Sequence, residues 1–190
     1  MTRIEQREKR RREILMVALD IFIHKGFAAA KTQDIANAAG MSEGLLFHYF
    51  ETKEKLYEEL IKIAITGRQT ALTGIKNDGL EYFQAAAKEI FRYLKHEPYV
   101  SKMFVLAGQA QNNDTVPEAV KALMAKIDFE HTVKKIKQGQ KKGDIKKGDP
   151  AALAFAFWGA IQGIAEQVAL LPDIPIPDSE WIVDIIRRRN

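Results

Sequence analysis

Residues 32 to 53 read Thr-Gln-Asp-Ile-Ala-Asn-Ala-Ala-Gly-Met-Ser-Glu-Gly-Leu-Leu-Phe-His-Tyr-Phe-Glu-Thr-Lys, and this stretch decides the fold. Thr32 is a candidate N-cap for a first short helix, and Asp34 adds a negative charge in the first turn, where the helix dipole favours it. Gly40 suits the left-handed backbone that ends a helix, and Ser42 then offers a second N-cap. The order predicts two short helices joined by a tight turn, a unit that places its second helix in a DNA groove.

The second helix of this pair has two distinct faces. Leu46 and Phe50 are four residues apart, so they share a face that can pack on the first helix. Leu45, His48 and Tyr49 share another face, which carries hydrogen-bonding groups and exposed apolar surface. An ordinary helical hairpin inside a bundle is the alternative interpretation of this stretch taken alone.

A longer signature surrounds the helix pair and extends over about the first third of the chain. Its residues are Ile14-Leu15, Ala18-Leu19, Phe22, Gly26-Phe27, Thr32, Asp34-Ile35-Ala36, Ala39-Gly40-Met41-Ser42, Gly44, Leu46-Phe47, Phe50 and Lys53-Glu54-Lys55-Leu56. This run resembles the DNA-binding domain of TetR-type transcriptional regulators. The resemblance implies an all-α fold, with an N-terminal three-helix helix-turn-helix domain followed by a larger α-helical ligand-binding and dimerisation domain. We expect the first domain over residues 8–68, with its motif at about 31–50, and the second over 69–190.

The resemblance also implies which residues contact DNA. The corresponding positions are Thr32, Ser42, Gly44, Leu45, Phe47, His48, Tyr49 and Lys53. Among them, Lys53 is expected to hold a phosphate, while Leu45, His48 and Tyr49 are better placed to touch bases. Two positions depart from the family's pattern: Phe47 stands where tyrosine is frequent and Glu43 where lysine is common. The operator sequence therefore cannot be taken over from relatives.

The function implied is that of a ligand-responsive repressor acting as a homodimer on a palindromic operator. Its expected partners are double-stranded DNA, a second copy of the chain and an unidentified small-molecule effector, with no cofactor, no metal and no membrane. Met1 leads into a charged segment without an apolar stretch, so we see no signal peptide and expect a cytoplasmic protein.

Basic residues are concentrated at the start of the chain. Residues 1–12 contain Arg3, Arg7, Lys9, Arg10, Arg11 and Arg12 against Glu5 and Glu8, and six minus two gives +4, the net charge of the whole chain. A basic arm ahead of a helix-turn-helix can contact phosphates or the minor groove, and the alternative is a solvated, frayed terminus. A second lysine cluster over residues 134–147 is interrupted by Gly139 and Gly143 and followed by Gly148, which favours a helix end and a solvated loop.

Groups for catalysis are scarce, and we predict that the chain is not an enzyme. It has no cysteine, which removes disulfides, thiolate nucleophiles and cysteine-based zinc sites. Its four histidines, at 24, 48, 96 and 131, are far apart in sequence, and none has a second histidine three or four residues away. No phosphate loop or nucleophile turn is present.

Helical patterns continue to the C-terminal end. We expect a first helix over about 6–25 stopped by Gly26, a long helix from Lys53 to the boundary stretch 74–79, and an amphipathic helix over 80–95. Residues 150–171 are apolar on nearly all sides, but Glu166 argues against a membrane span, so one side should face the core and another a partner. A last helix should carry Trp181, Ile182, Ile185 and Ile186. By the resemblance, these two final helices pair with their copies in a dimeric four-helix bundle, and a buried intramolecular hairpin is the alternative.

Residues for an effector site are harder to identify, because aromatic residues at helical spacing are usually plain core. The candidates are Phe83, Met103, Phe104, Phe155, Trp158 and Gln162. Gln162 and Glu166 are four residues apart, so they share a helix face and could bind a ligand or satisfy each other within an interface. The sequence does not identify the ligand.

Overall fold

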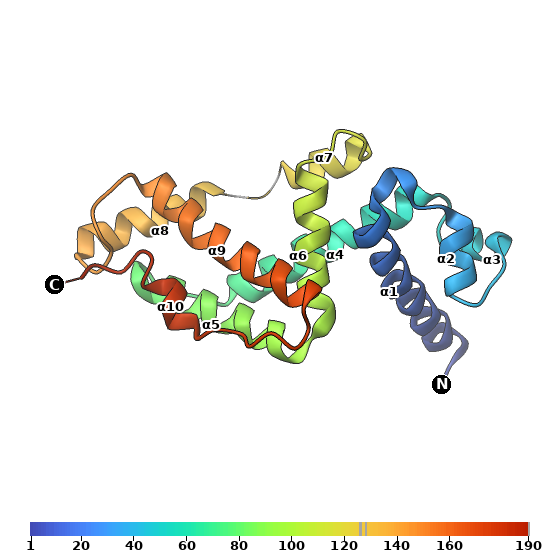
Figure 1. Cartoon of the computed structure of the whole chain (residues 1–190), viewed down its shortest axis with the longest axis horizontal. Helices are drawn as coiled ribbons and strands as arrows, with labels where there is room; N and C mark the ends of the chain where they lie inside the picture. The colour runs from blue at the N-terminus through green and yellow to red at the C-terminus, as the bar shows by residue number, and fades with distance from the viewer. Residues whose placement is uncertain (126, 128, 190) are drawn as a thin grey trace. The chain divides into compact units, whose positions relative to one another are not determined.

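The computed structural model describes residues 1–125, 127 and 129–189, and within them the chain is all-α, as predicted (Figure 1). Its helices are α1 (Arg3–Ala29), α2 (Thr32–Ala38), α3 (Glu43–Tyr49), α4 (Lys53–Thr73), α5 (Leu80–His96), α6 (Pro98–Gln111), α7 (Glu118–Met124), α8 (Phe129–Lys142), α9 (Pro150–Leu170) and α10 (Ser179–Val183). In this part of the chain the β pairing is an isolated bridge between Ile145 and Arg187.

The chain forms two compact units, and each contains two pieces of sequence. The first unit is Met1–Ile65 together with the segment that starts at Val105 and includes α7. The second is Thr66–Phe104 together with the segment from α8 to the C-terminal end. Helices α4 and α6 therefore each contribute residues to both units. The limits 8–68 and 69–190 stay a prediction for the two domains.

The core of the first unit is built on an aromatic cluster. Phe22 and Phe27 of α1 each lie 4.9 Å, ring centre to ring centre, from Tyr57 of α4. Gly26, between the two phenylalanines, has φ 74°, a backbone conformation that favours glycine, and it interrupts α1 as predicted. The helix begins earlier than expected, at Arg3, because Thr2 and Glu5 form a capping box, and it resumes beyond the break to Ala29.

The core of the second unit lies between α5, α8, α9 and α10. The amphipathic pattern of α5 is confirmed, since Leu80, Phe83, Ala87, Ile90, Phe91 and Leu94 are all buried. Phe83 meets Phe157 of α9 with ring centres 4.9 Å apart and an interplanar angle of 75°. Tightly packed aromatic pairs of this kind fix the relative position of two helices.

The apolar segment forms α9, a single helix of 21 residues that starts after an N-cap at Asp149. It is long and apolar enough to cross a membrane by length and composition, a test that the core helix of a soluble protein also passes. One face is buried on the core through Leu153, Phe157, Ile161 and others, whereas Phe155 and Leu170 on other faces are exposed. The inward-packing side is confirmed, and that a partner covers the exposed side stays a prediction.

The last helix is shorter than predicted. α10 has five residues, Ser179–Val183, and Ile185 and Ile186 lie beyond its end. Ile182, Val183 and Ile186 are buried against the core of the second unit, and the chain then continues as backbone paired to Ile145. Of the four apolar residues expected on this helix, Ile182 and Ile186 are buried and Trp181 is exposed. The backbone that follows Val183 forms a turn and a β bridge rather than more helix.

Candidate nucleic-acid interface

The turn between α2 and α3 has the geometry that the sequence predicts. Gly40 has φ +64°, and its N–H donates to the carbonyl of Asn37 at 3.0 Å. The N–H of Met41 donates to the carbonyl of Ala36, also at 3.0 Å, so the free carbonyls at the end of α2 find partners. Ser42 is confirmed as the N-cap of α3, since its hydroxyl accepts from the N–H of Leu45 at 3.2 Å.

Thr32 is not an N-cap, and that prediction is wrong. The N-cap of α2 is Lys31, which makes no side-chain capping bond, and Thr32 is the first helical residue. Its hydroxyl instead donates to the carboxylate of Glu43 in the first turn of α3. A hydrogen bond from the Thr32 hydroxyl to a charged carboxylate is stronger than one that the hydroxyl would accept from a backbone N–H. Thr32 therefore links α2 to α3 instead of capping α2.

The two faces of α3 are separated as expected. Leu46 and Phe50 are 1% and 4% exposed, and they hold the helix on the rest of the first unit. The outer face is formed by Ser42, Glu43, Gly44, Leu45, Phe47 and His48, all exposed. Leu45 and Phe47 keep 46% and 42% of their surface open, which is unusual for large apolar side chains on a helix of seven residues. Tyr49 is half-buried at the edge of this face.

Arg10 and Arg11 turn inward from the basic arm and fasten the helix pair. Arg11 Nη1 donates to the carbonyl of Tyr49 at 2.7 Å, its Nε donates to Glu59 at 3.0 Å, and its guanidinium lies 4.2 Å from the ring centre of Phe50. Arg10 Nη2 donates to the carbonyl of Ala39 at 2.8 Å. Sequence reasoning missed both roles, because the partners are 29 to 48 residues away and no local pattern joins them.

Lys53 connects the start of α4 to the end of α1. Its ammonium donates to the carbonyls of Phe27 and Ala30 at 2.8 and 3.0 Å, and it lies 4.4 Å from the ring centre of Phe27. An ammonium has three N–H donors, so one remains for a phosphate. The phosphate contact stays a prediction, and the structure adds a structural role to it.

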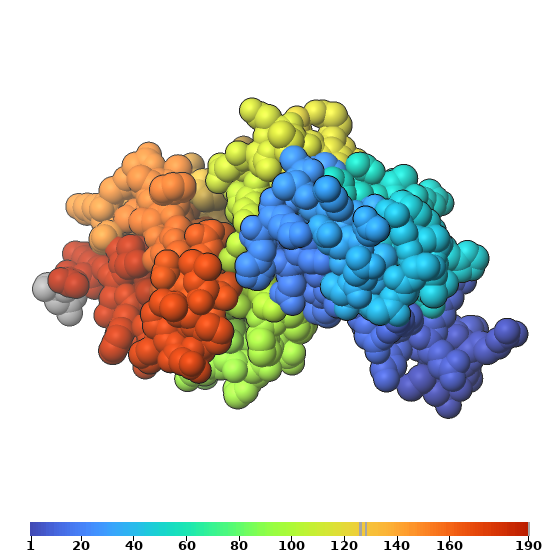
Figure 2. All heavy atoms as spheres, turned by 45° about the vertical axis from the view of Figure 1, so that its right-hand side comes forward, coloured from blue at the N-terminus to red at the C-terminus, as the bar shows by residue number. Residues whose placement is uncertain are grey.

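Exposed cations of the arm lie at the start of α1. Arg3, Arg7 and Arg12 are exposed, and the first turns of α1 extend beyond the packed helices α2 and α3 (Figures 1 and 2). Near the other end of α1, Lys25 donates to Asp34 at 2.8 Å, and this hydrogen bond holds the pKa of the Asp34 carboxyl below its ordinary value. Burial raises the pKa of Tyr57 to about 12, so the phenol stays neutral within the core.

The predicted effector residues are only partly brought together. Phe83 is fully buried beside Phe157, and the half-buried Trp158 meets Phe157 from the same helix with ring centres 5.2 Å apart. Gln162 donates to the carbonyl of Phe104 at 3.0 Å and to Glu166 at 2.7 Å, which supports mutual satisfaction of this polar pair. Met103 is buried in the same unit.

Phe155 is 73% exposed, so it does not join the buried Phe83 in the core. It follows the open side of α9, away from the face that packs on the core. Among the residues that the structure describes, no group of three or more acidic or histidine side chains is placed to hold a metal ion.

Comparisons with known proteins agree with this geometry. Residues 14–60 match the family model described as "Bacterial regulatory proteins, tetR family". The chain is 32% identical over 165 residues to the HTH-type transcriptional regulator RutR of Escherichia coli K12, covering 83% of this chain and 74% of RutR. It is 39% identical over 116 residues to the HTH-type transcriptional repressor KstR2 of Mycolicibacterium smegmatis, covering 60% of this chain and 56% of KstR2. The crystal structure of AibR in complex with isovaleryl coenzyme A and operator DNA superposes with a TM-score of 0.68 at 19% identity, covering 92% of this chain and 94% of AibR.

Proposed function

The chain belongs to the TetR family of bacterial regulatory proteins and is a DNA-binding transcriptional regulator, and on that premise we propose that it is a ligand-responsive repressor acting in the cytoplasm. The observation that carries the proposal is the outer face of α3, which exposes Leu45, Phe47 and His48 on a helix anchored from beneath. A short, anchored helix that exposes hydrogen-bonding and apolar side chains is suited to entering the major groove.

Contacts with DNA divide into two classes. His48 carries ring nitrogens that can hydrogen-bond base edges, and Leu45 offers apolar surface for a thymine methyl group. Ser42, Gly44, Lys53 and Thr32 lie at helix starts, where side chains and backbone N–H groups suit phosphate oxygens. Phe47 and Tyr49 contribute ring surface beside them. Arg3, Arg7 and Arg12 add sequence-independent attraction to the backbone.

The repressor acts as a homodimer on a palindromic operator. A two-fold axis presents two copies of α3 to two half-sites about one helical turn or a multiple apart. The open side of α9 supports this arrangement, since Gly159 and Gly163 are exposed with open space above them and Phe155 stands beside them. Figure 2 shows part of this helix, in orange, uncovered on the surface of the second unit. A partner helix covering this side would bury apolar area that is costly to leave in water.

Release from DNA follows from a shift between two conformations. An effector bound in the second unit favours a conformation that is wrong for the operator, and it shifts the equilibrium only by its differential affinity for the two states. Helix α4 carries Lys53 in the first unit and ends in the second, and we infer that this helix transmits the shift to the DNA-binding residues. AibR, crystallised with isovaleryl coenzyme A and operator DNA, has the same fold, which supports the pairing of a small ligand with an operator.

The base-reading role is tested by titrating labelled DNA from the region upstream of the gene with the wild type and His48→Ala. We expect the variant to bind this DNA about tenfold or more weakly and random DNA unchanged, because a lost base contact costs about 1–3 kcal/mol. His96→Ala is the matched control, since His96 is an exposed histidine at the end of α5. Equal losses on both DNAs, or an equal loss in the control, contradict base reading by α3.

The phosphate role of Lys53 has a different signature. Lys53→Ala should weaken binding to all DNA sequences and reduce the slope of log Kobs against log salt concentration by about 1. Because Lys53 also holds the Phe27 and Ala30 carbonyls, the unfolding midpoint of the variant is measured alongside. An unchanged salt slope with a lowered unfolding midpoint assigns Lys53 to the fold alone.

A further inference from the structure

Arg68 is a cation inside the second unit with hydrogen-bonding capacity to spare. It lies near the end of α4, is mostly buried, and its guanidinium carbon sits 4.7 Å from the ring centre of Trp158 on α9. Among the residues that the structure describes, none accepts a hydrogen bond from Arg68 or forms an ion pair with it. A guanidinium carries five N–H donors, and stacking on an aromatic face uses none of them.

The position of Arg68 is set by a chain of contacts across several helices. Trp158 donates from Nε1 to the hydroxyl of Thr132 on α8 at 3.2 Å, and Thr132 is 3% exposed. Tyr82 of α5 is also buried nearby, and its ring centre lies 5.6 Å from that of His131. Arg68 is thus the cationic member of a cluster to which α4, α5, α8 and α9 each contribute a side chain.

Burial works against this guanidinium. It lowers the pKa of Arg68, because taking a cation out of water disfavours its charged form. A cation held away from water needs compensating contacts, and those of Arg68 are the ring of Trp158 and an electrostatic interaction with Tyr82, which acts to raise its pKa. The forked N–H donors of the guanidinium therefore stay available to a ligand that supplies acceptors.

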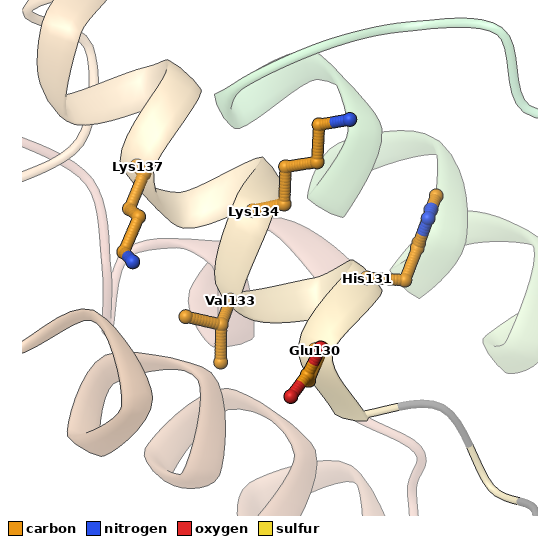
Figure 3. A pocket seen from close by; sticks show the side chains of 5 residues that line it. All are labelled: Glu130, His131, Val133, Lys134 and Lys137. Atoms are coloured by element: carbon orange, nitrogen blue, oxygen red, sulfur yellow. The ribbon is translucent and has the colours of Figure 1, made fainter.

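A hollow of about 630 Å³ opens on the same stretch of α8. It is lined by Glu130, His131, Val133, Lys134 and Lys137, all of which project from this helix (Figure 3). Two lysines against one glutamate leave the hollow with a positive balance, and its volume suits a small organic molecule.

We propose that the effector of this regulator is an organic oxyanion, whose carboxylate or phosphate accepts hydrogen bonds from Arg68 where it stacks on Trp158, in a unit whose α8 adds the positive charges of Lys134 and Lys137. The inference rests on the proposed function, since it assigns the ligand class of the same regulatory unit. Planar carboxylate and phosphate groups both match the forked donors of arginine. An anion that binds Arg68 acts on the helix that also carries Lys53.

Trp158 is a built-in reporter of this site. In a Trp181→Phe background it is the sole tryptophan, and Trp181 is 67% exposed, so its replacement leaves the core intact. The full chain is titrated with hexanoate, hexyl phosphate and the neutral hexanamide, and tryptophan fluorescence is followed. We expect a saturable change with one or both anions and binding at least tenfold weaker with the amide. The stronger of the two anions identifies whether the head group is a carboxylate or a phosphate.

Variants at Arg68 complete the test. Arg68→Gln should lose at least tenfold in anion affinity, Arg68→Lys should lose less, and Arg92→Gln, which removes an exposed arginine of α5, should lose nothing. Equal responses to hexanoate and hexanamide in the otherwise wild-type protein, which need no variant at Arg68, overturn the inference. DNA binding measured without ligand separates the two failures. If the protein binds its operator but does not respond to the anions, the oxyanion effector is contradicted and the repressor function is not. If it responds to the anions but does not bind an operator, the proposed function is contradicted.

Discussion

Replacement of Arg11 by alanine should loosen α3 from the first unit. The side chain makes hydrogen bonds to Glu59 and to the Tyr49 carbonyl and stacks on Phe50. A hydrogen bond to a charged group contributes about 1.5–3 kcal/mol when buried, and stacking on an aromatic ring about 0.5–1 kcal/mol when exposed. The side chains of Arg11 and Glu59 are 29% and 30% exposed, so water screens part of this energy, and we expect a loss of about 2 kcal/mol.

Urea unfolding followed by circular dichroism measures this loss, and DNA titration measures its effect on α3. Arg12→Ala is the matched control, because it removes the same charge from the next residue, which is exposed, and it should cost less than about 0.5 kcal/mol. Arg11→Lys keeps the charge but not the forked donors, so it should fall between the two. If Arg12→Ala destabilises the protein as much as Arg11→Ala, the assignment of Arg11 to the anchoring of α3 is refuted.

Three further outcomes follow from the same unit. Ser42→Ala should cost about 1 kcal/mol in urea unfolding, since it removes the N-cap of α3, and an unchanged midpoint would show that the 3.2 Å bond contributes nothing. Gly40→Ala should cost about 1–2 kcal/mol because φ is +64°, and a stabilised variant would contradict that conformation. Because the pKa of Asp34 is lower in the folded protein, the ionised carboxylate stabilises the fold fully above its ordinary pKa of 3.8. This stabilisation is lost as the pH falls through the folded-state pKa. The stability difference between the wild type and Asp34→Asn should therefore shrink from pH 6 to pH 3, and a constant difference would remove the ion pair with Lys25 as its cause.

The features that sequence predicted well are those decided within a few residues. The turn at Gly40, the cap at Ser42 and the buried pair Leu46 and Phe50 depend on backbone conformation, one side-chain bond and helical spacing. Each acts within a single turn of helix, so the order of residues is enough to read it. The same holds for the apolar face of α5.

The features that sequence missed depend on partners far along the chain. Thr32 follows a sound rule for N-caps, but Glu43, eleven residues later, attracts its hydroxyl. Gln109 of α6 donates to the carbonyl of Ile23 at 2.9 Å, a contact across 86 residues within the first unit. No spacing in the sequence indicates such a long-range contact. That α7 and part of α6 belong to the first unit could therefore not be predicted.

The proposed effector site shows the same limit. Trp158 was a candidate because it is aromatic, but its place under Arg68 depends on α4 and α9 meeting, 90 residues apart in the chain. Phe155, three residues earlier on the same helix, was an equally good candidate by sequence, but its side chain is exposed. Spacing assigns a residue to a helix face, and only packing decides which face encloses a ligand.

A nuclease footprint on DNA from the region upstream of the gene tests the central claim most directly. The account predicts protection of two half-sites related by two-fold symmetry, with centres about one helical turn or a multiple apart, and loss of this protection with His48→Ala but not with His96→Ala. A folded protein that leaves this DNA evenly cleaved, with and without anions, or a footprint that His48→Ala leaves intact, would contradict a repressor that binds its operator through α3.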